Sequence, residues 1–219
     1  RMGANISGIG SNTLTIQGVD SLKSIENIAV IPDRIEAGTF LIAAAAIGEK
    51  VKVTNIIPEH LESVVKCLKK ANVNVEVSDN SITVQSDNKN ISSTNIETNE
   101  YPGFPTDLQA QWMMLMCLAK GTSTIKENIY YDRFTHIMEL NRLGCNIKLE
   151  DSIAIIEGDR SLIGADVMST DIRASAALII AALCAKGTTK ISRVYHIDRG
   201  YDKIEEKLTN IGAEIFRKK

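Results

Sequence analysis

The stretch IEAGTFLIAAAAI, residues 35–47, decides the fold. It predicts a helix with small and apolar residues on almost every side, so the helix has no continuous polar face. In a globular domain, such a helix is buried all round rather than laid on the surface. Two more apolar runs, at 112–116 and 174–185, predict helices of the same kind. We therefore expect an α/β domain whose sheets wrap around a core of three helices.

An internal repeat of about seventy residues organises the chain. Three times a helix ends with Leu, three residues, Gly or Asn, any residue, a polar residue, and Ile or Val, and residues 1–6 match the back half of this unit. Gly adopts the left-handed backbone conformation freely and Asn tolerates it, so such a residue can close a helix. The residues at this position are Gly3, Asn72, Gly144 and Gly212. A second glycine separates each apolar helix from a short strand, at Gly48, Gly121 and Gly187.

Each repeat is predicted to run strand, helix, strand, helix, strand, strand. The first complete repeat predicts strands at 28–31 and 49–57, helices at 35–47 and 59–70, and a hairpin of 73–77 and 81–85. The residues before it, with a strand pair at 6–8 and 13–18, predict the tail of an earlier repeat. This pattern divides the chain into residues 1–29, which belong to another domain, and residues 30–219, a domain of three repeats.

The composition excludes several classes of function. With 219 residues, 44% hydrophobic side chains and a net charge of -2, the chain predicts a soluble globular protein without a basic nucleic-acid-binding surface. No apolar run is long enough to span a bilayer and no signal peptide pattern opens the chain, so we expect no membrane partner and a cytoplasmic location. The four cysteines are scattered and predict reduced core thiols, while the three histidines lack metal-ligand spacing.

The segment FPTDLQAQ, residues 104–111, is the main candidate for chemistry. Pro105 ends one element directly before a predicted helix, which places Thr106 and Asp107 at the start of that helix. One interpretation is a helix cap, in which either side chain accepts hydrogen bonds from amides of the first turn. The other is a carboxylate held where a ligand can reach it. The residues of this segment alone leave both open.

Five motifs follow one another along the chain: PDRIEAGTF at 32–40, FPTDLQAQ at 104–111, DRF at 132–134, TDIRAS at 170–175 and YHIDRGY at 195–201. Together, and in this order, they resemble the UDP-N-acetylglucosamine enolpyruvyl transferase family. The resemblance covers essentially the whole chain. It implies an inside-out α/β architecture, a barrel-like domain of three βαβαββ repeats around buried helices. It also implies that this chain is the C-terminal half of such a protein, with residues 1–29 as the tail of the N-terminal domain.

The resemblance implies transfer of the enolpyruvyl group of phosphoenolpyruvate to the 3-hydroxyl of UDP-N-acetylglucosamine. This is the first committed step of peptidoglycan precursor synthesis for the cell wall, with these two small molecules as partners and with no cofactor or metal. The chemistry needs a base for the sugar hydroxyl, an acid for the methylene carbon, and cations for phosphate and carboxylate. By resemblance, Asp107 is the base, Thr106 binds substrate, and the backbone of Ile129 touches the uridine nucleotide.

Arg199 resembles the arginine of the family that reaches phosphoenolpyruvate. A guanidinium group suits this task because its planar fork can engage an oxyanion through two hydrogen bonds. Without the motif, the simpler interpretation is a surface ion pair between Arg199 and either Asp198 or Glu205.

Arg133 resembles a source of positive charge near the closed site, and its alternative is a loop ion pair with Asp132 or Glu127. Arg173 has a similar alternative, because it lies at a predicted helix start and can pair with Asp171. Asp171 itself resembles the carboxylate that keeps the cationic cluster oriented, a supporting role rather than proton transfer.

The resemblance also implies what lies outside this chain. The family's reactive cysteine, with a lysine and an arginine that hold phosphoenolpyruvate, belongs to the N-terminal domain, and none of the four cysteines here matches it. That missing domain is therefore the expected protein partner, and we expect no useful turnover from the isolated chain. Two alternatives stay open: half of a shikimate-pathway enolpyruvyl transferase, and a non-catalytic ligand- or partner-binding module of the same fold.

Overall fold

The structure is a computed structural model, and it describes residues 1–48, 50–87 and 89–218. Its chain forms two compact units, Arg1–Pro32 and Asp33–Lys219. The first unit contains one antiparallel hairpin of strands β1 (Asn5–Ser7) and β2 (Thr15–Gln17), in which Ile6 lies opposite Ile16. This hairpin agrees with the strand pair expected at 6–8 and 13–18.

Residues 28–31 form no strand, so the strand predicted there is wrong. Their β-branched side chains are exposed: Ile28 is 65% exposed, Val30 88% and Ile31 69%. A strand needs a neighbouring strand that takes up its backbone hydrogen bonds, and β-propensity alone does not supply one. The strand prediction for this segment failed because no strand of the described chain pairs with it.

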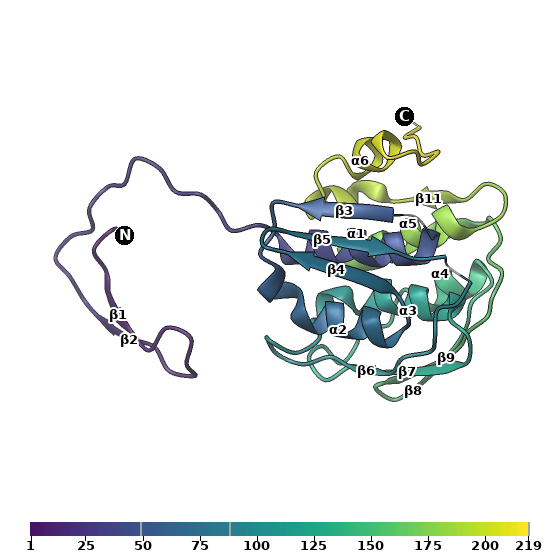
Figure 1. Cartoon of the computed structure of the whole chain (residues 1–219), viewed down its shortest axis with the longest axis horizontal. Coiled ribbons are helices and arrows are strands. Elements are labelled where there is room, and N and C mark those ends of the chain that lie inside the picture. The colour runs from purple at the N-terminus through teal and green to yellow at the C-terminus, as the bar shows by residue number, and fades with distance from the viewer. Residues whose placement is uncertain (49, 88, 219) are drawn as a thin grey trace. The chain divides into compact units, whose positions relative to one another are not determined.

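Three apolar helices form the core of the second unit, as the sequence predicts. They are α1 (Arg34–Ile47), α3 (Gln109–Leu118) and α5 (Ile172–Cys184), and they pack against one another inside the unit (Figure 1). Every residue of α3 from Gln109 to Cys117 is buried. Because these helices have no polar face, burial on all sides is the arrangement that removes their apolar surface from water.

Among the residues that the structure describes, three sheets surround this core. The first has the antiparallel order β3 (Lys50–Thr54), β5 (Ser81–Gln85), β4 (Asn74–Ser78). The second has the order β6 (Ile96–Glu97), β7 (Thr122–Lys126), β9 (Ile153–Glu157), β8 (Asn146–Glu150), and only the β6–β7 pair is parallel. The third is the parallel pair β10 (Asp166–Met168) and β11 (Lys190–Ser192). Glu49, predicted to begin the first of these strands, lies outside the described residues.

The remaining helices bury one side only. They are α2 (Glu62–Lys70), α4 (Ile137–Arg142) and α6 (Ile204–Asn210). Short 3-10 turns precede helices or close loops: η1 (Pro58–Leu61), η2 (Thr106–Leu108) and η3 (Val194–Arg199). Across the described residues, no helix combines the length and apolarity needed to cross a bilayer.

The expected repeat is present, but only the second copy is complete. That copy runs β6, α3, β7, α4, β8, β9, whereas the first copy lacks its opening strand. The third copy lacks its final hairpin within the described residues up to 218. The residues that follow α2, α4 and α6 are left-handed, with φ of 64° at Asn72, 101° at Gly144 and 103° at Gly212, and Gly3, which follows no helix in the described chain, has φ of 93°. This confirms the helix-closing pattern on which the repeat was based.

The three core helices run in the same direction. Near their starts, Gln111 of α3 donates a hydrogen bond to Thr39 of α1 over 3.0 Å, and Asp107, just before α3, lies 3.2 Å from Arg173 Nε of α5. At their other ends, Ala46, Leu118 and Cys184 line one hollow of about 580 Å³. The polar residues at the three helix starts are therefore gathered at one end of the core.

Gly38 is required at the contact between α1 and the start of α3. An ideal Cβ on Gly38 would overlap Leu108 Cδ1 and lie 3.3 Å from Leu108 Cδ2. Leu108 is fully buried and has no free space to turn into. We expect Gly38→Ala to lower the free energy of unfolding in urea by about 1–3 kcal/mol, despite the better helix propensity of alanine.

The control uses Leu108→Val, which shortens the blocking side chain. In that background Gly38→Ala should destabilise the protein less than it does in the wild type, because the overlap is relieved. An equal loss of unfolding free energy in both backgrounds would contradict the proposed contact.

Candidate functional site

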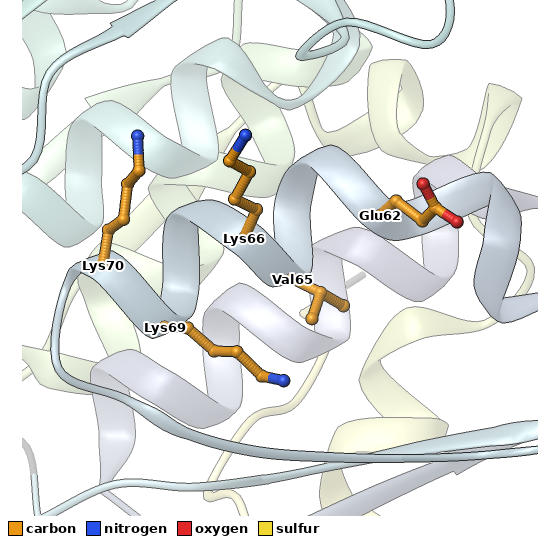
Figure 2. A pocket seen from close by; sticks show the side chains of 5 residues that line it. All are labelled: Glu62, Val65, Lys66, Lys69 and Lys70. Atoms are coloured by element: carbon orange, nitrogen blue, oxygen red, sulfur yellow. The ribbon is translucent and has the colours of Figure 1, made fainter.

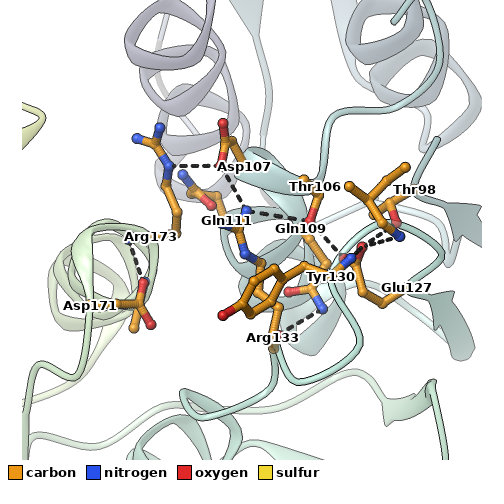
Figure 3. Close-up of polar contacts among 12 residues, drawn as sticks. Thr98, Thr106, Asp107, Gln109, Gln111, Glu127, Tyr130, Arg133, Asp171 and Arg173 are labelled. Carbon is orange, nitrogen blue, oxygen red and sulfur yellow. Dashed lines mark hydrogen bonds and ion pairs between the residues drawn. The ribbon is translucent and has the colours of Figure 1, made fainter. Parts of the chain in front are cut away.

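Asp107 lies in the turn η2 and does not cap a helix. Neither η2 nor α3 has a side-chain cap, so the helix-cap interpretation is wrong. Instead Asp107 Oδ1 lies 2.7 Å from Arg133 Nη1 and 3.2 Å from Arg173 Nε (Figure 3). Because of the 3-10 turn, the residue at the N-cap position of α3 is Leu108, whose side chain cannot accept hydrogen bonds. Asp107 contacts two guanidinium groups from other parts of the chain.

The two arginines set the protonation of Asp107. Burial of the half-buried carboxyl raises its pKa, but the hydrogen bond from Arg133 and the positive charge of Arg173 outweigh this effect. The pKa of Asp107 is therefore below its ordinary value, and at neutral pH the group is an ion-paired carboxylate. Burial lowers the pKa of Arg173, and the charge of Asp107 more than compensates, so that pKa is raised.

Thr106 connects Arg133 to a buried glutamate. Its hydroxyl donates to Glu127 Oε2 over 2.9 Å and accepts from Arg133 Nη1 over 3.3 Å. The Arg133 guanidinium also lies over the ring of Tyr130, with Cζ 5.3 Å from the ring centroid. The alternative in which Arg133 pairs with Asp132 or Glu127 is wrong, because its ion-pair partner is Asp107.

Asp171 is the N-cap of α5. Its Oδ1 accepts from the backbone N–H of Arg173 over 2.8 Å and from that of Ala174 over 2.9 Å. Burial raises the pKa of Asp171, but these amide hydrogen bonds outweigh it, so the pKa lies below its ordinary value. The alternative in which the Arg173 side chain pairs with Asp171 is therefore wrong. Asp171 holds Arg173 by its main chain, which leaves the guanidinium for Asp107.

Arg199 ends the turn η3 with an exposed side chain. In the part of the chain that the structure describes, this side chain makes no hydrogen bond or ion pair. The acidic residues that were its alternative partners are both held by Arg217, Asp198 at 2.7 Å and Glu205 at 2.8 Å. A Cβ on the next residue, Gly200, would lie 3.7 Å from Arg173 Nη1. The segment that carries Arg199 therefore runs beside Arg173, although Arg199 does not contact Asp107.

Ile129 is 44% exposed at the start of the loop that leads to Arg133. Its backbone N–H donates to Glu127 Oε1 over 2.9 Å. A ligand can bind this N–H only by displacing Glu127. The carbonyl of Ile129 is therefore the backbone group of this residue that is better suited to contact a ligand.

Several polar residues next to the candidate residues were missed by the sequence reasoning. The Tyr201 hydroxyl lies 2.7 Å from Thr39 Oγ1 and 3.4 Å from Gln111 Nε2, all of them buried. One usable signal was present, since Thr39 and Gln111 are polar residues near the starts of otherwise apolar helices. Glu127 had no such signal, because its four partners come from three different segments.

No cysteine in the chain has the character of an activated nucleophile. All four are free thiols: Cys67, Cys117, Cys145 and Cys184. Burial raises the pKa of Cys184 to about 12 and also raises that of Cys67. A thiol with a raised pKa is rarely ionised at neutral pH and reacts slowly. Among residues 1–48, 50–87 and 89–218, no group of His, Cys, Asp or Glu is arranged to hold a metal ion.

A hollow of about 470 Å³ lies on α2, away from Asp107. Figure 2 shows its lining, with long lysine side chains extending from one helix. The lining residues are Glu62, Val65, Lys66, Lys69 and Lys70. Lysine stems commonly cover apolar surface in this way while their charged ends stay in water. None of the candidate residues lines this hollow, so we place the candidate site at Asp107.

His136 is almost completely buried, near Arg133 and Asp171. Burial lowers its pKa to about 4. In the unfolded chain a histidine binds a proton near pH 6.5, so acidification between about pH 6.5 and pH 4 stabilises the unfolded state. We therefore expect the free energy of unfolding to fall by roughly 2–3 kcal/mol from about pH 7 to pH 4.5 because of this residue. Urea titrations at the two pH values measure this loss.

The matched variant is His136→Gln, which keeps a buried polar side chain without the titrating ring. It should lose much less stability over the same range. Asp107 and Asp171 have lowered pKa values, so their stabilising effect is lost only at lower pH, as they become protonated. An equal pH dependence in wild type and variant would show that His136 is not the source.

Comparison with known proteins identifies the family. The profile of EPSP synthase (3-phosphoshikimate 1-carboxyvinyltransferase) matches residues 1–208. Curated relatives named UDP-N-acetylglucosamine 1-carboxyvinyltransferase include a protein of Myxococcus xanthus, 48% identical over 219 residues, and one of Chlorobaculum parvum, 52% identical over 217 residues. These matches cover 100% and 99% of this chain but 52% and 51% of the relatives, so the chain spans about half of their length.

Solved structures agree with this result. The enolpyruvyl transferase NikO from Streptomyces tendae superposes with a TM-score of 0.89 at 28% identity, over 97% of this chain and 51% of that one. An EPSP synthase from Acinetobacter baumannii gives a TM-score of 0.67 at 14% identity, over 87% of this chain and 44% of that one, which supports the fold alone. The predicted resemblance and the inside-out α/β fold class are thus confirmed. The chain belongs to the EPSP synthase family of carboxyvinyltransferases and has the enolpyruvyl transferase fold.

Proposed function

We propose that this chain is part of an enzyme that transfers the enolpyruvyl group of phosphoenolpyruvate to the 3-hydroxyl of UDP-N-acetylglucosamine. The observation that carries the proposal is a carboxylate, Asp107, held between the guanidinium groups of Arg133 and Arg173. The reaction needs one base and several cations, and this cluster contains both. Relatives about 50% identical to the chain carry the name of this activity.

Asp107 is the base of the proposed reaction. It removes the proton of the sugar 3-hydroxyl as that oxygen bonds to the central carbon of phosphoenolpyruvate, while an acid outside this cluster protonates the methylene carbon. In the second step, an elimination, the same outside group takes a proton back from the methyl carbon as the bond between the central carbon and the phosphate oxygen breaks, which releases inorganic phosphate and restores the double bond. While they are paired with Asp107, the two arginines weaken it as a base, because they hold its pKa below the ordinary value.

The arginines are proposed to change partner when substrate binds. Phosphoenolpyruvate carries a phosphate and a carboxylate, and either anion can replace Asp107 as the partner of a guanidinium group. Loss of an arginine contact would raise the pKa of Asp107 and make it a better base. Arg199 has no partner among the described residues, so it can take up an anion without breaking an existing contact.

The other candidate residues have supporting roles in this proposal. Thr106 binds substrate indirectly, since its hydroxyl is bonded to Glu127 and to Arg133 and so helps to hold that guanidinium group, and the carbonyl of Ile129 contacts the uridine nucleotide. Asp171 keeps Arg173 in place through the backbone of α5.

The rest of the active site is proposed to come from another part of the same protein. Residues 1–29 are the tail of that other domain, and residues 30–219 form this domain. The reaction belongs to peptidoglycan precursor synthesis and takes place in the cytoplasm, where both substrates are available. Because the thiols of this chain have raised pKa values or are buried, the reactive cysteine is expected outside it.

A second candidate substrate is shikimate 3-phosphate, since the matching family profile carries that activity in its description. The identity of about 50% to relatives named for UDP-N-acetylglucosamine favours the sugar nucleotide. The EPSP synthase structures are only 14% identical to this chain and do not bear on the substrate.

The proposal predicts a large loss of activity on Asp107→Asn. The test protein joins this chain to the part of the Chlorobaculum parvum relative that the chain does not span, and the assay is phosphate release from phosphoenolpyruvate. With UDP-N-acetylglucosamine as acceptor, we expect Asp107→Asn to lower kcat by about 100-fold or more, because the base is lost. The matched control is Asp151→Asn in the exposed β8–β9 turn, where φ is 53° and Asn is tolerated, and it should leave kcat unchanged.

The same assay separates the alternatives. Phosphate release that depends on shikimate 3-phosphate would support the second substrate, and no release with either acceptor would support a non-catalytic module. We expect the 219-residue chain alone to release no phosphate, so turnover by this chain at the rate of the joined protein would contradict the proposed division of the site.

A further inference from the structure

Glu127 is a buried carboxyl group that joins two parts of the candidate site. It lies just after β7 and is only 3% exposed. Its Oε1 accepts from the Thr98 hydroxyl over 2.6 Å and from the backbone N–H groups of Ile129 and Tyr130 over 2.9 and 3.0 Å. Its Oε2 accepts from the Thr106 hydroxyl over 2.9 Å. All four partners are donors, so the carboxyl group is fully used as an acceptor.

The contact with Thr106 fixes the direction of that hydroxyl. A hydroxyl group has one proton to donate and lone pairs with which it accepts. Because the proton of Thr106 is given to Glu127, a lone pair is left to face Arg133 Nη1 at 3.3 Å. The same Nη1 atom donates to Asp107 Oδ1 over 2.7 Å. Glu127, Thr106, Arg133 and Asp107 are therefore joined by consecutive hydrogen bonds, in which Arg133 donates both to Asp107 and to Thr106, and Thr106 donates to Glu127 (Figure 3).

Glu127 also holds the main chain that carries Arg133. Its bonds to the amides of Ile129 and Tyr130 fix the first residues of the loop, and the Tyr130 ring lies against the Arg133 guanidinium. The other end of this segment is held by Gln109, whose Nε2 donates to the Arg133 carbonyl over 3.3 Å. The loop and the guanidinium group thus depend on the same buried carboxyl.

We propose that Glu127 is a positioning residue that keeps Arg133 against Asp107 by orienting the Thr106 hydroxyl and the loop at 129–130. The geometric part of this inference stands on the hydrogen bonds alone, whereas its importance for proton transfer rests on the function proposed above. Truncating one member of a buried network alters its neighbours, so the effect should reach Asp107 although Glu127 does not touch it.

The test measures the pKa of the Asp107 carboxyl group in the 219-residue chain. The ¹³C chemical shift of the carboxyl carbon is followed by NMR as the pH is changed. In Glu127→Gln an NH₂ group takes the place of Oε2 and donates a hydrogen bond to the Thr106 hydroxyl. The hydroxyl proton of Thr106 must then turn away from residue 127, and this weakens the hydrogen bond that Arg133 donates to Thr106. We expect the pKa of Asp107 to rise toward its ordinary value. Removal of a negative charge near a carboxyl lowers its pKa, so a direct charge effect has the opposite sign.

Two further variants give the experiment its controls. Thr98→Val removes a different hydrogen bond to Glu127 and should leave the pKa of Asp107 unchanged. Thr106→Val removes the link itself, so it should raise that pKa, and adding Glu127→Gln in this background should raise it no further. If circular dichroism shows that Glu127→Gln is unfolded, Glu127→Asp replaces it, because the shorter side chain withdraws from Thr106.

An unchanged or lowered pKa of Asp107 in a folded Glu127 variant would overturn the proposal. Glu127→Gln keeps the oxygen that accepts from the Ile129 and Tyr130 amides, so it tests the route through Thr106 alone. Additive shifts in the double variant would therefore also overturn the proposal, because the effect would not pass through Thr106. The titration requires no substrate and no turnover, so its result does not depend on the proposed activity. Failure of the phosphate-release assay and failure of this inference are therefore distinguishable.

Discussion

The mutual burial of three apolar helices is the constraint on which the rest of this structure depends. A helix such as α3, with every residue from Gln109 to Cys117 buried, must be covered on all sides, so the sheets lie outside it. The three helices run in the same direction, which gathers the residues at their starts. Asp107 before α3 and Arg173 at the start of α5 meet for this reason, and Arg133 reaches them from the loop after β7. The candidate site is thus a consequence of how the core is packed.

Sequence reasoning predicted the features that depend on local pattern. The apolar helices, the repeat, and the left-handed residues that close its helices each follow from side-chain spacing or from the conformational freedom of Gly and Asn. It failed where the outcome depends on a distant partner. Residues 28–31 have strand-forming side chains but no neighbouring strand, and Asp107 precedes a helix but binds two arginines in place of the amides. Glu127 was seen only as a possible partner of Arg133, since its contacts with Thr98 and Thr106 appear only in the folded chain.

The ion pairs of Asp107 with Arg133 and Arg173 conflict with its proposed role as a base, and the mechanism has to resolve this conflict. A carboxylate held by two guanidinium groups is stable and well oriented, yet it is a poor base because its pKa is lowered. Exchange of arginine partners resolves this conflict, since the anions of phosphoenolpyruvate would compete for the same guanidinium groups. In the proposed mechanism the pairing orients Asp107 before substrate binds and releases it afterwards. Arg199, exposed and unpaired among the described residues, would be a first contact for the incoming anion.

The most direct test of this account is the distance between Arg133 Nη1 and Asp107 Oδ1 in a crystal structure of the joined protein with UDP-N-acetylglucosamine and an unreactive analogue of phosphoenolpyruvate. In the structure described above this distance is 2.7 Å. The account predicts that it lengthens beyond hydrogen-bonding range, about 3.5 Å, with Arg133 turned to an anion of the ligand and Asp107 facing the sugar 3-hydroxyl. An unchanged ion pair in the liganded site, with the sugar hydroxyl out of reach of Asp107, would contradict it.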